Sequence, residues 1–335
     1  MKILYYAPLI LATYAAPAFA NITVSIPYNG NEVESPFALS ATAANCSSQT
    51  TAAMGYSLDN STDTTIVNST FIQAKVASGT GAHILHVKAW GNAGSVCVTD
   101  VAITVTATVA AIPTDAISVG SLQTLSNWVA QPDTGSGGRS VGSMSLINSP
   151  SLSGNARKFV SNYLAYGDQR FYASFGDDTV STNFFYDAWV YLPSPSISIA
   201  NLEMDMNQVM SNGQTVIFGI QCDGWSGTWD YTANQGTPQH YVDVWLHSKA
   251  ACNPRQWSTN TWHHVQISYS RDNSGNVTYG SVWLDGAQSI LNVTVPSAFA
   301  LGWAPTLLTN FQVDGYLATS GIATAYLDDL TIDRW

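Results

Sequence analysis

Two carboxylates stand two residues apart in the stretch Asn-Leu-Glu-Met-Asp-Met-Asn-Gln-Val-Met, which covers residues 201–210. On a β-strand, successive side chains point to opposite faces, so Glu203, Asp205 and Asn207 share one face. The leucine and the methionines share the other face, which suits a core. Because burying unpaired carboxylates is costly, we expect the polar face to be wet or functional. Glu203 and Asp205 are therefore candidate functional residues.

A Gly-rich stretch with closely spaced aromatic residues follows this strand along the chain, and we expect it to be a loop in which not every ring is buried. Exposed flat rings beside hydrogen-bonding groups can stack on the apolar face of a pyranose, while the polar groups fix its orientation. For any single tryptophan, packing in the core is the competing interpretation, and Trp245 could extend the same platform. The predicted carbohydrate-binding residues are Asn207, Gln208, Gln221, Asp223, Trp225, Trp229, Tyr231 and Trp257.

The composition limits the class of protein. The chain has 335 residues, of which 46% are hydrophobic and only 10% are charged, with a formal net charge of −11. Disorder is excluded by the hydrophobic content, and nucleic-acid binding by the lack of positive charge. Residues 1–20 have Lys2, a short apolar stretch and Ala18-Phe19-Ala20, which predicts a secretory signal peptide. No later run is long enough for membrane insertion, so a secreted protein is expected.

Four cysteines in an exported chain favour disulfides. Four cysteines allow three connectivities. We choose the one that keeps each bridge within one domain, which pairs Cys46 with Cys97 and Cys222 with Cys252.

The elements that must hold these residues are strands. Short runs rich in Val, Ile, Thr and aromatic residues recur between Gly, Asn, Asp, Ser and Pro, which predicts an all-β chain of two sandwiches. We expect a domain at 21–108, a linker at 109–117 and a second domain at 118–335. The strands expected in the first domain are Ile22–Ile26, Phe37–Thr42, Ala53–Leu58, Thr65–Val67, Phe71–Val76, His83–Trp90 and Ser95–Val105.

Both domains resemble known families. The opening "SIPYNGNEVESPFALSATA" and the closing "VTDVAITV" of the first resemble bacterial immunoglobulin-like modules, which implies an Ig-like β-sandwich used as a spacer. In the second, "TWHHVQI", "SVWLDG" and "AYLDDLTIDRW" resemble the laminin-G-like members of the concanavalin A-like lectin and glucanase superfamily. That resemblance implies a jelly-roll sandwich and leaves the activity open.

Residues 201–210 also resemble the active strand of retaining glucanases, Glu-x-Asp-x-x-Glu or Glu-x-Asp-x-Glu. The resemblance implies that Glu203 is the nucleophile and Asp205 its assistant. The position of the general acid falls on Gln208 or Asn207, and neither amide can donate and recover a proton. Retaining hydrolysis needs two carboxyl groups roughly 5–5.5 Å apart, so an acid would have to come from another strand, with Asp223 or Asp187 as donors.

Other ionisable residues suggest structural roles. His263 and His264 are adjacent on an expected strand, so their rings point to opposite faces and cannot share one metal ion. The pairs Asp177-Asp178 and Asp328-Asp329 could supply oxygen ligands to a structural calcium ion, with solvated turn acids as the alternative; no other cofactor or metal is expected. A polysaccharide lyase ranks last, because the net charge repels a polyanionic substrate.

The sequence therefore predicts a secreted protein that binds a neutral polysaccharide, such as a β-glucan, or a cell-surface glycan, in a groove around Glu203. One alternative is a retaining endo-acting glycoside hydrolase with Glu203 as nucleophile. A second is a cell-surface adhesion or structural module, in which Glu203 would pair with Arg255 or Lys249. The oligomeric state is left open.

Overall fold

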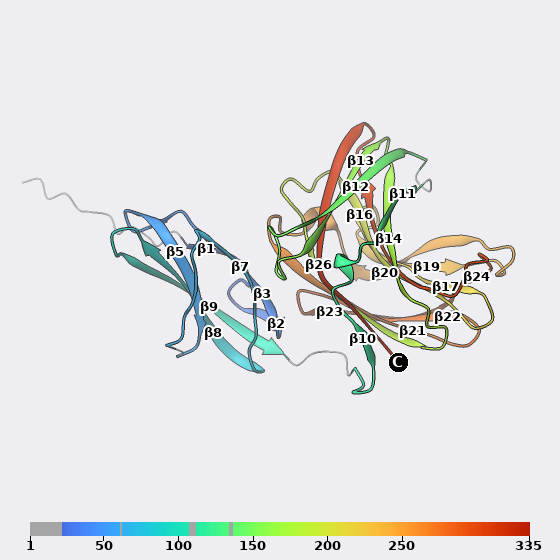
Figure 1. The fold of residues 1–335 in the computed structure, drawn as a ribbon, viewed down its shortest axis with the longest axis horizontal. Coiled ribbons are helices and arrows are strands. Elements are labelled where there is room, and N and C mark those ends of the chain that lie inside the picture. The colour runs from blue at the N-terminus through green and yellow to red at the C-terminus, as the bar shows by residue number, and fades with distance from the viewer. Residues whose placement is uncertain (1–21, 61, 107–111, 134–136) are drawn as a thin grey trace, which may run out of the picture.

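The computed structural model describes residues 22–60, 62–106, 112–133 and 137–335, which form β-strands almost throughout (Figure 1). Two short 3-10 helices, η1 (Leu122–Thr124) and η2 (Pro254–Gln256), interrupt them, and these described ranges contain no α-helix. The expected all-β fold class is confirmed. The predicted signal peptide at 1–20 and residues 109–111 of the predicted linker lie outside the described residues.

Residues 22–60 and 62–106 form two sheets. The smaller sheet has the strand order β1-β3-β7, and the larger has β2-β9-β8-β5-β4 with β6 on β5. The strands are β1 (Ile22–Ile26), β2 (Asn31–Glu34), β3 (Phe37–Ala43), β4 (Asn45–Cys46), β5 (Gln49–Leu58), β6 (Thr65–Val67), β7 (Phe71–Val76), β8 (Gly81–Gly91) and β9 (Val96–Thr106). All seven expected strands are present, and β2 and β4 are additional.

A small apolar core lies between these two sheets, with Leu39, Met54, Ile72 and Leu85 almost fully buried. The predicted bridge between Cys46 and Cys97 is present, with the two Cα atoms 5.6 Å apart. It joins β4 to β9 within this part of the chain. Whether the sandwich is of the immunoglobulin type stays a prediction.

The rest of the chain folds into two larger sheets. One has the order β12-β13-β26-β15-β21-β22-β23, with β10 on β26. Its strands are β10 (Ile117–Val119), β12 (Arg139–Ile147), β13 (Ala156–Leu164), β15 (Asn183–Tyr191), β21 (Trp262–Arg271), β22 (Asn276–Leu284), β23 (Ala287–Pro296) and β26 (Ser320–Arg334).

The second of these sheets has the order β11-β14-β25-β16-β18-β19-β20, with β17 paired to β16 and β24 paired to β17. Its strands are β11 (Val129–Asp133), β14 (Asp168–Gly176), β16 (Ile199–Val209), β17 (Thr215–Phe218), β18 (Ile220–Asp223), β19 (Thr228–Asn234), β20 (Asp243–Ala251), β24 (Ala298–Phe299) and β25 (Leu307–Gly315). We call it the groove sheet, because its outer face carries the site described below.

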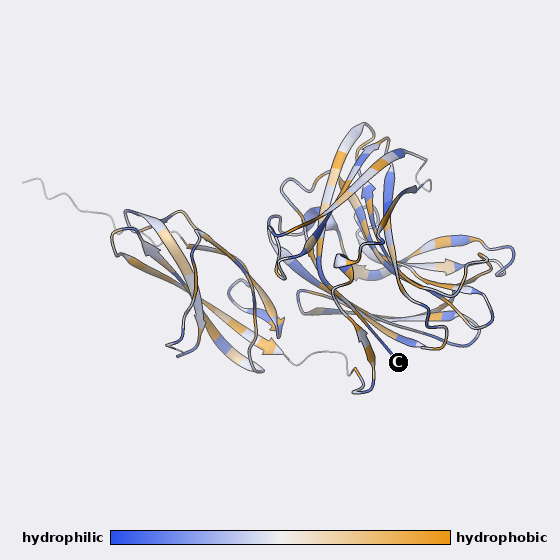
Figure 2. Ribbon diagram, viewed as in Figure 1, coloured by the Kyte–Doolittle hydropathy of each residue, from blue (hydrophilic) through white to orange (hydrophobic). Residues whose placement is uncertain are grey.

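The main core fills the space between the two large sheets. Phe159 of one sheet packs against Phe171 and Phe311 of the other, with ring centroids 4.7 and 5.1 Å apart. Hydrophobic and hydrophilic residues alternate along many of the strands (Figure 2), as expected for strands with one core face and one outer face. This alternation decides which side chains reach the outer face of the groove sheet.

The N-terminal sandwich docks on the sheet opposite the groove sheet. Ile26 and Ala38 join a small buried cluster with Trp189, Tyr191 and Trp262 of β15 and β21. Lys75 forms an ion pair with Asp329, and its ammonium lies 5.6 Å from the centroid of the Trp189 ring. The contact therefore leaves the outer face of the groove sheet uncovered. Within the described residues, no helix has the length and apolar character to span a bilayer.

Candidate functional site

A groove of about 1530 Å³ runs across the outer face of the groove sheet. Strands β11, β14, β25 and β16 supply its floor, with further side chains from β18, β19 and β20. The segment 301–306 and the turn that carries Trp225 contribute its rim. The groove is large enough for several sugar rings, because typical ligand pockets measure about 300–1,000 Å³.

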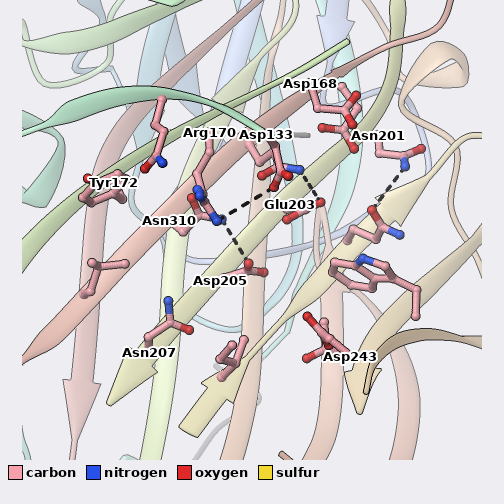
Figure 3. Close-up of a pocket in the computed structure, with 18 of the residues that line it drawn as sticks. Asp133, Asp168, Arg170, Tyr172, Asn201, Glu203, Asp205, Asn207, Asp243 and Asn310 are labelled. Atoms are coloured by element: carbon pink, nitrogen blue, oxygen red, sulfur yellow. Dashed lines mark hydrogen bonds and ion pairs between the residues drawn. The ribbon is translucent and has the colours of Figure 1, made fainter. Parts of the chain in front are cut away.

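Strand β16 runs through the middle of the groove and presents polar side chains to it. Asn201, Glu203, Asp205 and Asn207 line the groove in sequence along one strand (Figure 3). The intervening Leu202, Met204 and Met206 are fully buried in the main core. The faces predicted from the alternation in this strand are confirmed.

Glu203 is held by amides on both neighbouring strands. Gln312 of β25 and Gln221 of β18 are its register partners, and Gln312 Nε2 donates a hydrogen bond of 2.7 Å to Glu203 Oε1. The carboxyl is only 6% exposed. Burial, with the nearby charge of Asp314 as the next cause, raises the pKa of Glu203 well above its usual range. Burial therefore favours the protonated form of Glu203.

Asp205 is the second buried carboxyl of the floor. It accepts hydrogen bonds from the backbone N–H of Ile220, at 2.9 Å, and from Asn310 Nδ2, at 3.0 Å. Burial raises the pKa of Asp205 to about 7, although these two donors act in the opposite direction. The floor thus holds two carboxyls that titrate far from their ordinary range.

Strands β14 and β25 supply residues that the sequence analysis did not identify. Arg170 and Tyr172 come from β14, and Asn310, Gln312 and Asp314 come from β25; all five line the groove. For the β25 residues, the sequence feature that could have identified them is the alternation Asn-Phe-Gln-Val-Asp at 310–314. It repeats the polar and apolar pattern of residues 203–207. Trp303 on the rim had no such signal, because it lies in an irregular segment.

Exposed rings border the groove. Trp225 is 54% exposed, Trp303 41% and Tyr166 40%. Trp225 contacts Tyr166 edge to face, with centroids 5.6 Å apart, and lies 4.7 Å from Tyr316. The guanidinium of Arg255 lies 3.6 Å from the centroid of Tyr316 and donates to the carbonyl of Gly224 at 2.6 Å. These contacts hold the Trp225 ring at the rim while leaving much of it open to solvent.

Three aromatic residues predicted for the platform lie elsewhere. Trp229 is 1% exposed and Trp257 8%, and both belong to the main core. Tyr231 packs on that core, with its ring 5.3 Å from that of Tyr279. The prediction of a loop was wrong, because β18 and β19 form a hairpin with only residues 224–227 in the turn. Trp229 is opposite Cys222 in this hairpin, on the core face.

Gln208 does not reach the groove either. Its side-chain amide donates to the carbonyls of Asp178 and Ser181, at 3.1 and 3.0 Å, and accepts from Arg271 Nε at 2.5 Å. Gln208 follows Asn207 on the strand and so points to the opposite face. Gln221 lines the groove as predicted, beside Asn201, whose Nδ2 donates to Gln221 Oε1 at 3.2 Å.

The two aspartates that were predicted to supply the general acid, Asp187 and Asp223, do not line the groove. Asp187 lies on β15 of the opposite sheet, where it accepts from His264 and Gln266, both at 2.8 Å. Asp223 is on the groove sheet but is not among the residues that line the groove. The carboxyl whose charge acts most strongly on Glu203 is instead that of Asp314 on β25.

Asp223 belongs to a small cluster beyond the β18 side of the groove. One ligand atom each of Asp223, Asp230 and His247 lies within 4.8 Å of the others, and His247 Nδ1 is 2.7 Å from Asp230 Oδ2. Thr228 Oγ1 also donates to Asp230, at 2.6 Å. The bridge between Cys222 and Cys252 is present as predicted and ties β18 to the residue that follows β20.

The Asp pairs considered for calcium serve as hydrogen-bond acceptors. Asp328 accepts from the backbone N–H of Leu152 and Ser153, at 2.6 and 3.0 Å, and from nearby hydroxyls. Asp178 accepts from Ser181 and from Arg334 Nε. Donors around a carboxylate compete with a cation for its oxygens, and a structural calcium ion at these pairs stays a prediction.

His263 and His264 have separate structural partners, in line with the predicted opposite orientations. His263 Nδ1 is 2.7 Å from Asp285 Oδ2. His264 stacks on Trp189, with centroids 4.2 Å apart, and its Nε2 contacts Asp187. Neither imidazole is near the groove.

No protein-family model matches the chain, and no curated protein matches its sequence. Several solved structures are similar to the chain at low sequence identity. A carbohydrate-binding module of the β-sandwich superfamily has 12% identity over 94% of this chain and 97% of that chain, with a TM-score of 0.33. The cellulose-induced protein Cip1 has 17% identity over 62% of this chain and 90% of its own, with a TM-score of 0.37.

Arcelin-5, a lectin-like defence protein of Phaseolus vulgaris, has 14% identity over 66% of this chain and 98% of its own, with a TM-score of 0.36. Similarity at this level carries no information on substrate. The function must therefore be argued from the groove itself.

Proposed function

We propose that this chain is an exported carbohydrate-binding protein that holds a polysaccharide along the groove. The observation that carries the proposal is the combination of an open groove of about 1530 Å³, a floor of carboxyls and amides, and exposed rings at its rim. The two disulfides support an extracellular location, because such bridges persist in oxidising compartments.

Each part of the groove has a task in sugar recognition. The exposed faces of Trp225 and Trp303 can stack on the apolar faces of sugar rings. The carboxyl and amide groups of β16 and β25 can accept and donate hydrogen bonds to hydroxyls. The net charge of −11 disfavours a polyanion, so the ligand is a neutral polysaccharide, such as the predicted β-glucan, or a cationic one.

Affinity electrophoresis through gels that contain a single polysaccharide tests this proposal. We expect the protein to be retarded by at least one member of a panel of β-glucans and amino-sugar polymers, and Trp225→Ala to lose most of the retardation. Tyr28→Ala is the matched control, because Tyr28 is also 54% exposed but lies in the N-terminal sandwich. Equal retardation of Trp225→Ala and the unmodified protein in every gel would reject the groove as the binding site.

A glycoside hydrolase is the second candidate, and Asp314 is the observation that favours it. The regular acid position on β16 is Asn207, but the carboxyl of Asp314 acts on Glu203 from the adjacent strand. Burial and the nearby charge of Asp168 raise the pKa of Asp314 well above its usual range, which suits a general acid. Glu203 and Asp314 would then be the two carboxyl groups of hydrolysis.

A reducing-end assay on the same polysaccharides separates the two candidates. Binding without turnover predicts no new reducing ends from any substrate. Product that disappears in both Glu203→Gln and Asp314→Asn would establish the hydrolase instead.

The adhesion alternative predicted an ion pair between Glu203 and Arg255 or Lys249. Glu203 accepts from Gln312, and Arg255 lies against Tyr316. With the groove open above Glu203, the geometry gives this alternative no support.

A further inference from the structure

Three aspartates lie side by side across the floor at one end of the groove. Asp133 on β11 is opposite Asp168 on β14, and Asp168 is opposite Asp314 on β25. All three line the groove. Side chains opposite each other on one face of a sheet are roughly 4.5–5.5 Å apart at Cβ, and like charges in such positions are destabilising. A row of this kind concentrates negative charge at this end of the groove when its members are ionised.

The groove as a whole carries far more negative than positive groups. Its lining residues that are charged when ionised comprise six acids, namely Asp133, Asp168, Glu203, Asp205, Asp243 and Asp314, and one base, Arg170. Arg170 Nη1 lies 3.8 Å from Asp133 Oδ2. One guanidinium cannot balance carboxyls spread over β11, β14, β25, β16 and β20. The acids follow the length of the groove, from Asp133 and Asp168 past Glu203 and Asp205 to Asp243 (Figure 3).

Unpartnered acceptors point to what is missing. Asp314 is 6% exposed, and its Oδ1 has no hydrogen-bond partner. The Oδ1 atoms of Asn207 and Asn310, which also line the groove, have none either. Buried polar atoms are nearly always paired, and donors on a ligand in the groove can supply these missing partners. Hydroxyl and ammonium groups can both donate, but only ammonium also offsets the surplus of carboxyls.

A single divalent cation fits the row less well. Calcium needs six to eight oxygens converging at 2.3–2.6 Å. Among the described residues, the group with three ligand atoms within 4.8 Å of one another is Asp223, Asp230 and His247, and it does not include the row. The oxygens of Asp133, Asp168 and Asp314 therefore do not converge on one ion. An ammonium group donates at most three hydrogen bonds, and several such groups along one chain match the acids spread along the groove.

We infer that the polysaccharide bound in this groove carries free amino groups, as a chain of deacetylated amino sugars does, with one ammonium at the row of Asp133, Asp168 and Asp314. This inference rests on the proposed function and specifies its ligand. Stacking on Trp225 and Trp303 supplies affinity for the sugar rings, and the carboxyls select for charge. A neutral glucan would satisfy the acceptors but would not offset the excess of acids over bases in the groove lining.

Titration calorimetry with three hexasaccharides tests the inference. Fully deacetylated glucosamine hexamer, N-acetylglucosamine hexamer and cellohexaose are titrated into the full chain in EDTA-containing buffer. We expect the deacetylated hexamer to bind at least about tenfold more tightly than the other two. The difference should shrink when NaCl is raised from about 50 to about 500 mM, because salt screens the ionic contribution.

Variants that neutralise single acids show which residues cause the preference for the deacetylated hexamer. Asp314→Asn and Asp168→Asn should each weaken binding of the deacetylated hexamer about fivefold more than they weaken binding of cellohexaose. Asp177→Asn, which removes the same charge from an exposed loop outside the groove, is the control. Thermal melting of each variant confirms that it is folded.

The outcomes separate the two proposals. Equal binding of all three hexamers, or tighter binding of cellohexaose, would overturn the inference about charge and leave the proposed function standing. Binding of none of them, together with no retardation in any gel, would overturn both. Stoichiometric binding of CaCl2 that Asp314→Asn abolishes, without preference for the deacetylated hexamer, would replace the ammonium with a metal ion.

Discussion

The residues of the groove floor show how one strand can serve a core and a site. Leu202, Met204 and Met206 anchor β16 in the core, while Glu203 and Asp205 are carried on its other face. Both carboxyls are almost fully buried. Hydrogen bonds from Gln312, Asn310 and the backbone of Ile220 stabilise them there. Burial of acids with raised pKa values costs stability above their unfolded pKa, which makes their titration measurable.

Replacing Asp205 should change the pH dependence of stability. Burial raises the pKa of Asp205 to about 7, from 3.8 in an unstructured chain. Between those values the folded state keeps a proton that the unfolded state has lost, so the free energy of unfolding falls as pH rises, by at most about 1.4 kcal/mol per pH unit from this group. Asp205→Asn should flatten that slope in urea unfolding between pH 5 and 7.

The Asp205→Asn variant can keep its hydrogen bond to Asn310, so we expect it to fold. The Oδ1 of Asn310 has no partner, so its amide can turn to accept a hydrogen bond from an asparagine at position 205. Glu203 and Asp314 contribute slopes of the same sign in both proteins, and the difference between the two isolates Asp205. An unchanged slope would show that Asp205 is ionised across this range in the folded chain.

Gln208 should matter for folding and not for binding. Gln208→Leu removes the acceptor of Arg271 Nε and the donor to the carbonyls of Asp178 and Ser181. We expect a loss of about 1–3 kcal/mol in the free energy of unfolding, because buried polar groups are left unpaired. Retardation in affinity gels should be unchanged once the variant is folded. A loss of binding without a loss of stability would show that Gln208 belongs to the binding site.

At the scale of elements, alternation along strands explains both what was predictable and what was not. The alternation in residues 201–207 placed Glu203 and Asp205 correctly, because a strand has only two faces. Trp229 and Tyr231 were misplaced, because composition alone did not separate the short turn at 224–227 from the strands on either side. The partnership of Glu203 with Gln312 joins residues that are 109 positions apart, and only the sheet order brings them together.

The two tryptophans of the β18–β19 hairpin should have different roles, Trp229 in stability and Trp225 in binding. Trp229→Ala should lower the free energy of unfolding by about 3–5 kcal/mol, because the ring is fully buried in the core. Trp225→Ala should cost far less stability, since the ring is half exposed. Urea unfolding of both variants measures the loss of stability, and the gel assay measures the loss of binding. Equal losses of stability would contradict it.

The bridge between Cys222 and Cys252 should stabilise this end of the groove sheet. The two residues are 30 positions apart, so removing the bridge by a double Cys→Ala variant should cost about 3–4 kcal/mol, mainly by freeing the unfolded chain. The measurement is urea unfolding under non-reducing conditions. A loss below about 1 kcal/mol would indicate that the surrounding contacts hold the hairpin without the bridge.

At the scale of the whole molecule, the two sandwiches share an interface on the side away from the groove. Trp189, Tyr191 and Trp262 would be exposed without it, and Lys75 adds a pair with Asp329. Lys75→Glu places a like charge opposite Asp329, so we expect the sandwiches to separate and the radius of gyration to rise in small-angle X-ray scattering. An unchanged radius would show that the apolar cluster holds the interface alone.

The central claim is that a polysaccharide lies in the groove, and hydrogen exchange followed by mass spectrometry tests it most directly. The full chain is compared alone and with glucosamine hexamer or cellohexaose at saturating concentration. The account predicts slower exchange at residues 224–227, at residues 301–306 and in strands β14, β16 and β25. Slower exchange confined to the opposite sheet or to the N-terminal sandwich, with the groove unaffected, would contradict it.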